Sequence, residues 1–220
     1  MTLRFLLDSA DIRSWEPLWS LGLFSGITTN PTLLRRAGLP CTLGSIDRLV
    51  REALSLGCHE LHLQAWGSSS EELHSCAEAL LNLGPEQIVV KLPLTTEGLH
   101  AARIWIEKGR RITLTACYGP SQALAAAALG ATYVAPYLGR IGDLGKDGSA
   151  EVIRMQRCLA GVGSSTQLLV ASLRSLEEIV LLASAGVCIF TVSPALAQQI
   201  WSHPETDKAA ARFEQDAQNP

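Results

Sequence analysis

The chain has 220 residues, 47% hydrophobic and 18% charged, which is enough apolar material to bury a full core and excludes a mainly disordered chain. Eighteen Lys and Arg residues stand against 21 Asp and Glu residues, so the formal charge is −3. No basic stripe runs through the sequence, and nucleic acid is therefore a poor candidate partner.

Short apolar runs alternate with longer amphipathic stretches along the whole chain, which predicts strands separated by helices. We predict strands at residues 3–7, 25–29, 60–65, 87–92, 111–114, 132–136, 167–171 and 187–192. Helices are predicted at residues 12–19, 45–56, 69–83, 95–109, 150–159 and 176–184, with an alanine-rich helix ending at residue 129 and short helices after the eighth strand.

This alternation predicts a parallel sheet, because a crossover helix returns the chain to the same edge after each strand. Runs such as IVVKL and CIFTV are almost continuously apolar, as parallel strands covered on both faces are. Eight such units predict an α/β fold, a (β/α)8 TIM barrel forming one domain over residues 1–220, with a C-terminal helical tail from about residue 195. A doubly wound open sheet is the alternative, although neither GxGxxG after the first strand nor GxxxxGK[ST] occurs.

Polar residues gather at the carboxyl ends of the predicted strands, which is where a TIM barrel carries its chemistry. Chance would scatter such residues along the strands, so the clustering predicts that they converge on one mouth. In strand order they are Asp8, Thr28 with Asn30, Gln64, Lys91, Thr115, Tyr137 with Arg140, Ser172, and Ser193.

Lys91 is the most informative of these residues, because it interrupts the aliphatic run IVVKLPL. Burial disfavours the charged ammonium group and lowers the pKa of a lysine. A neutral amine can attack a carbonyl carbon and form a Schiff base. The alternative is a structural lysine whose ammonium reaches solvent or pairs with Asp8.

Three other strand-end residues have both a chemical and a structural interpretation. Asp8 can accept a proton from a substrate hydroxyl, or serve as the acid at a helix start. Gln64 is a predicted buried amide that needs hydrogen-bond partners and can be purely structural. Tyr137 can hold a water molecule or donate a proton, or it can simply pack.

Arg140, Ser172 and Arg174 follow the sixth and seventh predicted strands. Phosphate sites in TIM barrels often use the loops after strands seven and eight, so these three side chains predict a phosphate site with charge-assisted hydrogen bonds. The alternative for Arg174 is an exposed arginine in a salt bridge. We expect Arg140 to precede a loop with the sequence GDLGKDG.

The sequence predicts no metal site and no membrane segment. His59 and His62 are three apart on a predicted strand and should lie on opposite faces, and no other His, Cys and Asp residues have ligand spacing. Six cysteines without a CxxC pair favour free thiols and a cytoplasmic location. No signal-peptide apolar core fits the N-terminus, and the charge-free stretch 179–200 contains glycine, proline and glutamine, so we expect helix, turn and strand there.

Four motifs occur in the order GITTNPTLL, IVVKLPLTTEGL, TYVAPYLGRI and VASLRS. They resemble the short transaldolase-like proteins, in particular the fructose-6-phosphate aldolase branch, and the resemblance runs from Leu6 to Asp216. It implies a single-domain (β/α)8 barrel that forms a Schiff base with a ketose and needs no metal or cofactor. Because family members of this length form rings in which the C-terminal tail reaches the next subunit, it also implies a homo-oligomer, a pentamer or a decamer.

The resemblance assigns roles to single residues. Lys91 matches the Schiff-base lysine, and Asp8 matches the acid that accepts the substrate hydroxyl proton. Gln64 and Tyr137 match the pair that positions a catalytic water in the aldolase branch, where transaldolases carry glutamate and phenylalanine. The implied substrate-binding residues are Thr28 and Asn30 for the dihydroxyacetone portion, Thr115 and Ser172 lining the pocket, and Arg140 and Ser172, with Arg174 nearby, for the phosphate.

The implied function is reversible cleavage of fructose 6-phosphate to dihydroxyacetone and glyceraldehyde 3-phosphate. One alternative is a transaldolase of the pentose phosphate pathway, which passes the three-carbon unit to erythrose 4-phosphate and forms sedoheptulose 7-phosphate. Another is a non-catalytic barrel that binds sugar phosphates. Three departures bear on substrate range: the segment GRIGDLGKDG resembles transaldolases more than aldolases, Trp66 is expected to crowd the mouth, and Leu114 replaces a glycine before Thr115.

Overall fold

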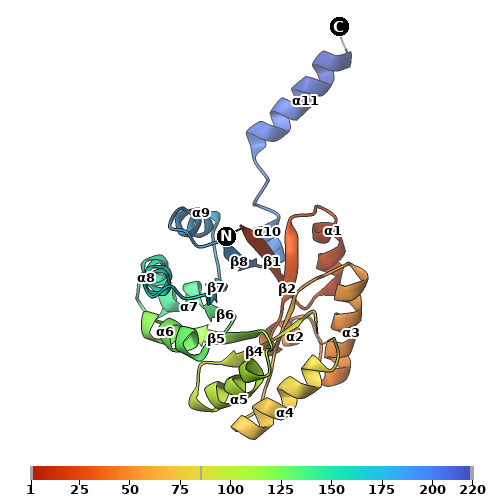
Figure 1. Ribbon diagram of the computed structural model, residues 1–220. Helices are drawn as coiled ribbons and strands as arrows, with labels where there is room; N and C mark the ends of the chain where they lie inside the picture. The colour runs from red at the N-terminus through yellow and green to blue at the C-terminus, as the bar shows by residue number, and fades with distance from the viewer. Residues whose placement is uncertain (1, 85, 219–220) are drawn as a thin grey trace.

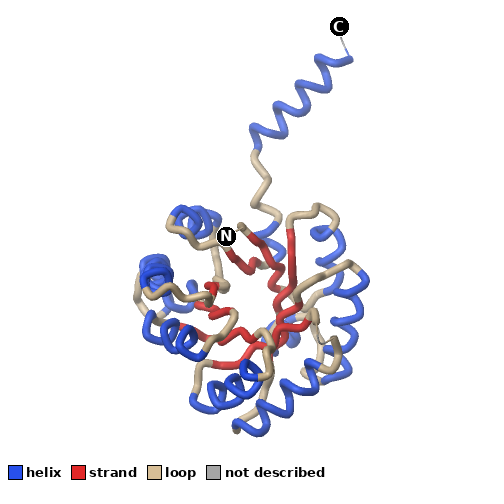
Figure 2. Tube along the Cα trace, viewed as in Figure 1, coloured by secondary structure: helices blue, strands red, loops and turns tan. Residues whose placement is uncertain are grey.

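The computed structural model describes residues 2–84 and 86–218. Eight parallel strands form one sheet that curls into a nearly closed barrel, with helices around its outside (Figures 1 and 2). Neighbours in the sheet follow the order β7-β6-β5-β4-β3-β2-β1-β8, as the predicted (β/α)8 TIM barrel requires. The strands are β1 Arg4–Asp8, β2 Phe24–Thr28, β3 Leu61–Gln64, β4 Ile88–Pro93, β5 Ile112–Cys117, β6 Tyr133–Pro136, β7 Gln167–Leu168 and β8 Ile189–Val192.

The barrel closes between β7 and β8 through hydrogen bonds beyond the short β7. The strand predicted at residues 167–171 is regular only over its first two residues. Further along, the N–H of Val170 donates to the carbonyl of Ile189 at 3.0 Å, and the N–H of Thr191 donates to the carbonyl of Val170 at 2.9 Å. Because the two outer strands meet, the open doubly wound sheet is excluded.

Helices cover the outer face of the sheet, and every predicted helix is present with small shifts at its ends (Figure 2). The helices are the 3₁₀ helix η1 Ile12–Ser14, α1 Trp15–Trp19, α2 Pro31–Arg36, α3 Leu43–Ser55, α4 Ser70–Leu81, α5 Thr96–Glu107, α6 Pro120–Leu129, α7 Leu138–Asp143, α8 Gly148–Gly161, α9 Leu176–Ser184, α10 Pro194–Ala197 and α11 Pro204–Gln218. None of the described helices is long and apolar enough to cross a membrane.

Two short helices at the mouth of the barrel, α2 and α7, differ from the sequence prediction. The Oδ1 atom of Asn30 caps α2 by accepting a hydrogen bond from the N–H of Leu33 at 3.1 Å. Pro31 suits the first helical position, because an N–H there would have no partner within the helix and proline has none. Arg140 lies inside α7 rather than before a loop, which corrects the prediction. Each helix has only six residues, too few for an amphipathic period to show in the sequence.

Strand alternation divides the apolar residues into an outer and an inner cluster. On β4, Val90 and Leu92 belong to the large cluster between sheet and helices, whereas Val89 belongs to a small cluster inside the barrel. Successive side chains of a strand point to opposite faces, so Lys91 shares the inner face with Val89. The same alternation that builds the core therefore turns the lysine into the barrel.

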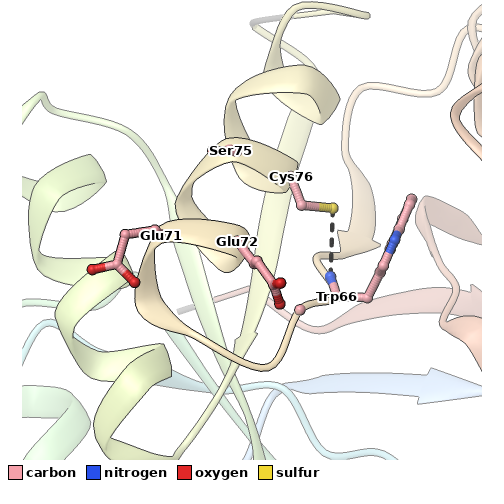
Figure 3. A pocket seen from close by; sticks show the side chains of 6 residues that line it. Trp66, Glu71, Glu72, Ser75 and Cys76 are labelled. Atoms are coloured by element: carbon pink, nitrogen blue, oxygen red, sulfur yellow. Dashed lines mark hydrogen bonds between the residues drawn. The ribbon is translucent and has the colours of Figure 1, made fainter.

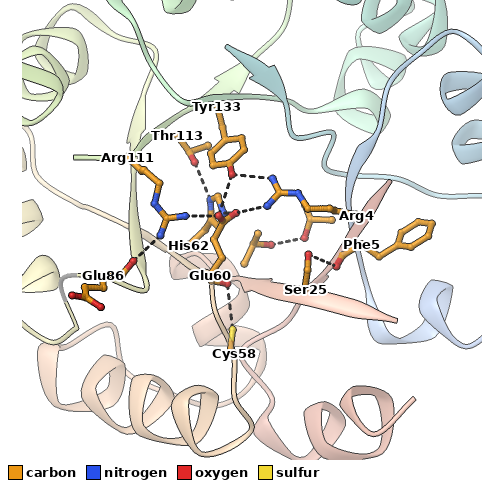
Figure 4. Close-up of polar contacts among 12 residues, drawn as sticks. Arg4, Phe5, Ser25, Cys58, Glu60, His62, Glu86, Arg111, Thr113 and Tyr133 are labelled. Carbon is orange, nitrogen blue, oxygen red and sulfur yellow. Dashed lines mark hydrogen bonds and ion pairs between the residues drawn. The ribbon is translucent and has the colours of Figure 1, made fainter. Parts of the chain in front are cut away.

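A charged cluster, which we call the floor cluster, closes the barrel interior at the amino ends of the strands (Figure 4). Its centre is Glu60, whose Oε1 lies 2.8 Å from Nε2 of His62 and whose Oε2 accepts hydrogen bonds from Arg111 at 2.6 Å and Tyr133 at 3.0 Å. Burial alone would raise the pKa of Glu60, but the bond to His62 and the nearby arginine charges lower it to about 2. The floor cluster consists of Arg4, Glu60, His62, Arg111, Thr113 and Tyr133.

The C-terminal helical tail has two parts. The short α10 packs against the barrel, where Leu196 and Ala197 are buried. In contrast, α11 stands away from the barrel (Figure 1), and none of its residues is buried. Phe213 on this helix is 71% exposed, so its ring is left open to solvent in the single chain.

Candidate active site

A hollow of about 750 Å³ opens at the carboxyl ends of the strands, and residues that follow all eight strands line it. It holds nine of the ten predicted site residues, so the clustering inferred from the strand ends produces a real cavity. These nine are Asp8, Asn30, Gln64, Lys91, Thr115, Tyr137, Arg140, Ser172 and Arg174.

Lys91 extends from β4 and is only 5% exposed. Its Nζ donates a hydrogen bond to the backbone carbonyl of Thr29 at 3.0 Å. Burial lowers the pKa of Lys91, and the negative charge of Asp8 opposes that shift only in part. The neutral amine, which is the nucleophilic form, is therefore easier to reach here than for a lysine in water.

Asp8 is held by a chain of hydroxyl groups beneath the hollow. Thr28 donates to Oδ1 of Asp8 at 2.6 Å, and the Thr28 oxygen lies 2.6 Å from the hydroxyl of Thr191. Because the single proton of Thr28 goes to the carboxylate, Thr191 must be the donor in the second bond. Thr28 is fully buried and does not line the hollow, so its predicted place among the substrate contacts becomes a supporting position under Asp8.

Gln64 and Tyr137 are joined through Thr115. The Nε2 of Gln64 donates to the carbonyl of Lys91 at 3.1 Å, and its Oε1 accepts from Thr115 Oγ1 at 3.2 Å. Thr115 also hydrogen-bonds Tyr137, while burial raises the pKa of Tyr137. The phenol therefore stays protonated at neutral pH and can act as a proton donor.

The three residues predicted to bind phosphate lie on one side of the hollow, and each makes different contacts. The guanidinium of Arg140 sits 4.9 Å from the ring centre of Tyr137. Arg174 lines the hollow. It also forms a salt bridge, as the alternative for this residue predicted, because both its terminal nitrogens donate to Asp143, at 2.8 and 2.6 Å. Ser172 stands between β7 and α9, where its carbonyl accepts the N–H of Gly139 at 2.9 Å.

Two lining residues without glycine's freedom have left-handed backbones. Ala116 has a φ of 58° at an irregularity of β5, and Ser172 has a φ of 62°. Such conformations cost on the order of 1–3 kcal/mol each and gather at functional sites. Their presence at two strand ends marks the mouth independently of side-chain chemistry.

Among the lining residues that were not singled out from the sequence are Arg36, Ala116, Asp143 and Thr191. Arg36 and Asp143 belong to the two unpredicted helices, α2 and α7. Thr191 carries a detectable signal, because it is polar and lies one residue before the end of the apolar run CIFTV. Ala116 has no chemical signal, since only its backbone is unusual.

Trp66 does not crowd the mouth, contrary to the expectation. It lines a separate, open hollow of about 420 Å³ beside α4, together with Glu71, Glu72 and Cys76 (Figure 3). Its backbone N–H lies 3.4 Å from the sulfur of Cys76. The ring packs against the large apolar cluster between sheet and helices, which keeps it out of the hollow.

The positions of the two histidines also differ from the sequence prediction. His59 lies before β3 rather than on it, whereas His62 is on β3 and points into the floor cluster. In the part of the chain that the structure describes, no group of three or more His, Cys, Asp or Glu side chains is arranged to hold a metal ion.

Residues 5–219 match the family model described as Transaldolase/Fructose-6-phosphate aldolase. The chain belongs to this family. The matched region is nearly the whole sequence. It includes the four quoted motifs, the residues that line the hollow and every predicted site residue.

Curated family relatives are similar over nearly their full length. "Probable transaldolase 2" of Listeria monocytogenes is 32% identical, with 97% of this chain and 95% of the relative aligned. "Probable transaldolase" of Dictyoglomus turgidum is 33% identical over 97% of each chain. "Probable transaldolase" of Lactiplantibacillus plantarum is also 33% identical, over 97% of this chain and 96% of the relative.

Solved structures from outside the family share the barrel. A monomeric dihydrodipicolinate synthase variant superposes with a TM-score of 0.59 at 16% identity, covering 86% of this chain and 69% of that one. A mandelate oxidase variant gives 0.58 at 14% identity, covering 88% and 65%. At these identities the likeness concerns the fold alone.

Proposed function

We propose that this family member is a cytoplasmic class I aldolase that cleaves fructose 6-phosphate reversibly to dihydroxyacetone and glyceraldehyde 3-phosphate. The observation that carries the proposal is the buried amine of Lys91, with its lowered pKa, which lines a hollow that also holds Asp8. A volume of about 750 Å³ is ample for a sugar phosphate and lies in the usual range for small-molecule sites.

In the proposed reaction the amine of Lys91 attacks the C2 carbonyl and expels water, forming an iminium ion. Asp8 accepts the proton of the C4 hydroxyl, the C3–C4 bond breaks, and its electron pair moves into the iminium to give an enamine. Tyr137 and a water molecule held by Gln64 return a proton to C3. Hydrolysis of the imine then releases dihydroxyacetone; each positioned proton transfer contributes about 10²–10⁴ in rate.

The phosphate is assigned to the side of the hollow where Arg140, Ser172 and Arg174 lie, and Asn30 and Thr115 face the three-carbon part of the sugar. Arg140 and Arg174 supply guanidinium groups, which bind phosphate oxygens through charge-assisted hydrogen bonds. Arg174 already forms a salt bridge with Asp143. A phosphate that binds Arg174 must therefore share its guanidinium with this carboxylate.

The second candidate is a transaldolase, which the printed names of the curated relatives favour. A transferase holds the enamine until an aldehyde arrives, whereas a lyase protonates it promptly and hydrolyses the imine. Tyr137 provides a protonated hydroxyl where transaldolases carry phenylalanine, and Gln64 is an amide where they carry an ionisable glutamate. These two residues favour release of dihydroxyacetone.

The deciding experiment measures glyceraldehyde 3-phosphate released from fructose 6-phosphate, with and without erythrose 4-phosphate. An aldolase releases it without the acceptor, and Gln64→Glu then raises the share of transfer. Release that starts only when erythrose 4-phosphate is added would replace the aldolase by the transaldolase. Borohydride reduction with dihydroxyacetone should add mass to the one peptide that contains Lys91; an unchanged mass would leave only a sugar-phosphate-binding barrel.

We also propose that the chain forms a homo-oligomer, a pentamer or a decamer. Ala209, Ala210 and Phe213 share one face of α11, and this apolar stripe has no cover within the described part of the chain. A second copy can supply that cover. Light scattering should give a ring mass for the full chain and a smaller mass for a chain ending at residue 203; an active full-length monomer would contradict this.

A further inference from the structure

One basic side chain of the hollow has no role in the reaction described above. Arg36 is the last residue of α2 and lines the hollow. We propose that Arg36 is an additional specificity residue, whose positive charge increases the affinity of the site for substrates that carry a phosphate ester. This inference rests on the proposed function, because the sugar-phosphate substrate class is taken from it.

The backbone places Arg36 on the wall of the hollow. Asn30 anchors the start of α2 at the end of β2, and Thr32, Leu33 and Arg36 all line the cavity. Their spacing of three and four residues puts them on one face of the helix. Arg35 precedes Arg36 by one position, about 100° around the helix, and is not a lining residue.

The charges of the phosphate side leave room for another cation. Arg140 and Arg174 bring two positive charges, but Asp143 pairs with Arg174 and removes one of them, so the net charge there is +1. A phosphate ester carries a charge of about −1.5 to −2 near neutral pH. Its binding is therefore incompletely neutralised by these three side chains.

Arg36 is free to supply the missing charge. None of the ion pairs within residues 2–84 and 86–218 includes it. The strand order puts β2, before α2, four strands from β6, before α7, so the two helices form opposite walls of the hollow. A phosphate ester on the Arg140 side therefore lies across the hollow from Arg36, whose charge attracts it at a distance, and low-dielectric walls strengthen such a field.

The test compares Arg36→Ala with the matched control Arg35→Ala, which removes the same charge from the same short helix outside the hollow. The substrates are glyceraldehyde 3-phosphate and glyceraldehyde, each condensed with dihydroxyacetone, which differ only by the phosphate. We expect Arg36→Ala to raise KM for the phosphorylated aldehyde about threefold to tenfold at low salt, with kcat little changed. Arg35→Ala should change it less than about twofold.

Three further readouts separate charge from structure. Arg36→Lys should keep most of the affinity, high salt should shrink the effect of Arg36→Ala, and the inhibition constant of inorganic phosphate should rise by the same factor as KM. Glyceraldehyde should show no change in KM. Equal effects of Arg35→Ala and Arg36→Ala, or an equal rise in KM for glyceraldehyde, would overturn the role of Arg36 and leave the aldolase intact.

Failure of the proposed function is recognised by a different result. If borohydride traps no dihydroxyacetone on the wild-type chain, the Schiff-base reaction is wrong. Calorimetric titration with inorganic phosphate then still tests Arg36, because it needs no turnover. Weaker phosphate binding by Arg36→Ala than by Arg35→Ala supports the inference, and equal binding contradicts it.

Discussion

The two ends of the barrel interior both contain buried polar groups, but the catalytic candidate at the mouth, Lys91, has fewer partners than the central carboxylate of the floor cluster, Glu60. Glu60 bonds to His62, Arg111 and Tyr133, and both ring nitrogens of His62 are engaged. At the mouth, Nζ of Lys91 makes one hydrogen bond to another described residue, although it could donate more. Saturated groups stabilise the fold, whereas unsaturated groups remain available to a substrate.

Burial acts on both regions, and the partners decide its outcome. At the floor, two permanently charged arginines and a hydrogen bond outweigh burial, and the pKa of Glu60 falls to about 2. At the mouth, burial outweighs the charge of Asp8, and the pKa of Lys91 falls. One end therefore holds a fixed charge and the other a lysine that can become neutral, which is what a Schiff base requires.

Lys91→Arg should give the largest effect and bears on the mouth alone. Arginine keeps the positive charge but cannot become neutral to attack a carbonyl, so the cleavage rate should fall at least about a thousandfold. Circular dichroism should show a retained fold. Borohydride labelling on any other lysine, or substantial activity of this variant, would contradict the mechanism.

Glu60→Gln tests the floor. It leaves Arg4 and Arg111 without their carboxylate, so the free energy of unfolding measured in urea should fall by about 3 kcal/mol. The matched control is Asp47→Asn, which breaks an exposed pair with Arg51 and should cost less than about 0.5 kcal/mol. Similar losses for the two variants would show that the floor cluster stabilises the barrel no more than a surface pair does.

Tyr137→Phe should lower the rate of fructose 6-phosphate cleavage by about tenfold to a hundredfold, because the enamine loses its proton donor. The control is Tyr118→Phe, whose ring stands edge-on to Tyr137 at 6.1 Å and is not among the residues lining the hollow. Transfer to erythrose 4-phosphate should suffer less than cleavage. An equal loss in both reactions would assign Tyr137 to substrate binding instead.

The pH dependence of stability should give the smallest effect. Burial lowers the pKa of His62 from 6.5, so below that pH the unfolded chain binds a proton that the folded chain refuses. The unfolding free energy should therefore fall by about 1 kcal/mol per pH unit just below pH 6.5. Glu60 adds a second loss as pH falls from its ordinary 4.5 towards 2.

His62→Gln separates these two contributions. The variant should lose the slope just below pH 6.5 and keep the loss below pH 4.5, whatever its absolute stability. Urea unfolding across the pH range measures both. A slope unchanged by this substitution would show that another group takes up the proton.

Much of the barrel could be predicted from the sequence because its strands are buried on both faces and end on polar residues. The run IVVKLPL identifies Lys91 by chemistry, since a lysine among aliphatic residues must lie at a special site or at a strand end. The short helices α2 and α7 could not be predicted, although Asn30 followed by Pro31 is a helix-start signal. Six residues do not complete two turns, so no periodicity supports that signal.

The sequence by itself determined which segments are strands, that these strands run parallel, and which polar side chains stand at their carboxyl ends. Local pattern suffices for this, because burial on both faces and period-two alternation act within each strand. The tertiary structure alone decided which polar groups meet. The bonds from Thr191 through Thr28 to Asp8 and the floor cluster around Glu60 join residues far apart in sequence. Closure of the barrel also puts Arg36 opposite Arg140, and no local pattern sets these distances.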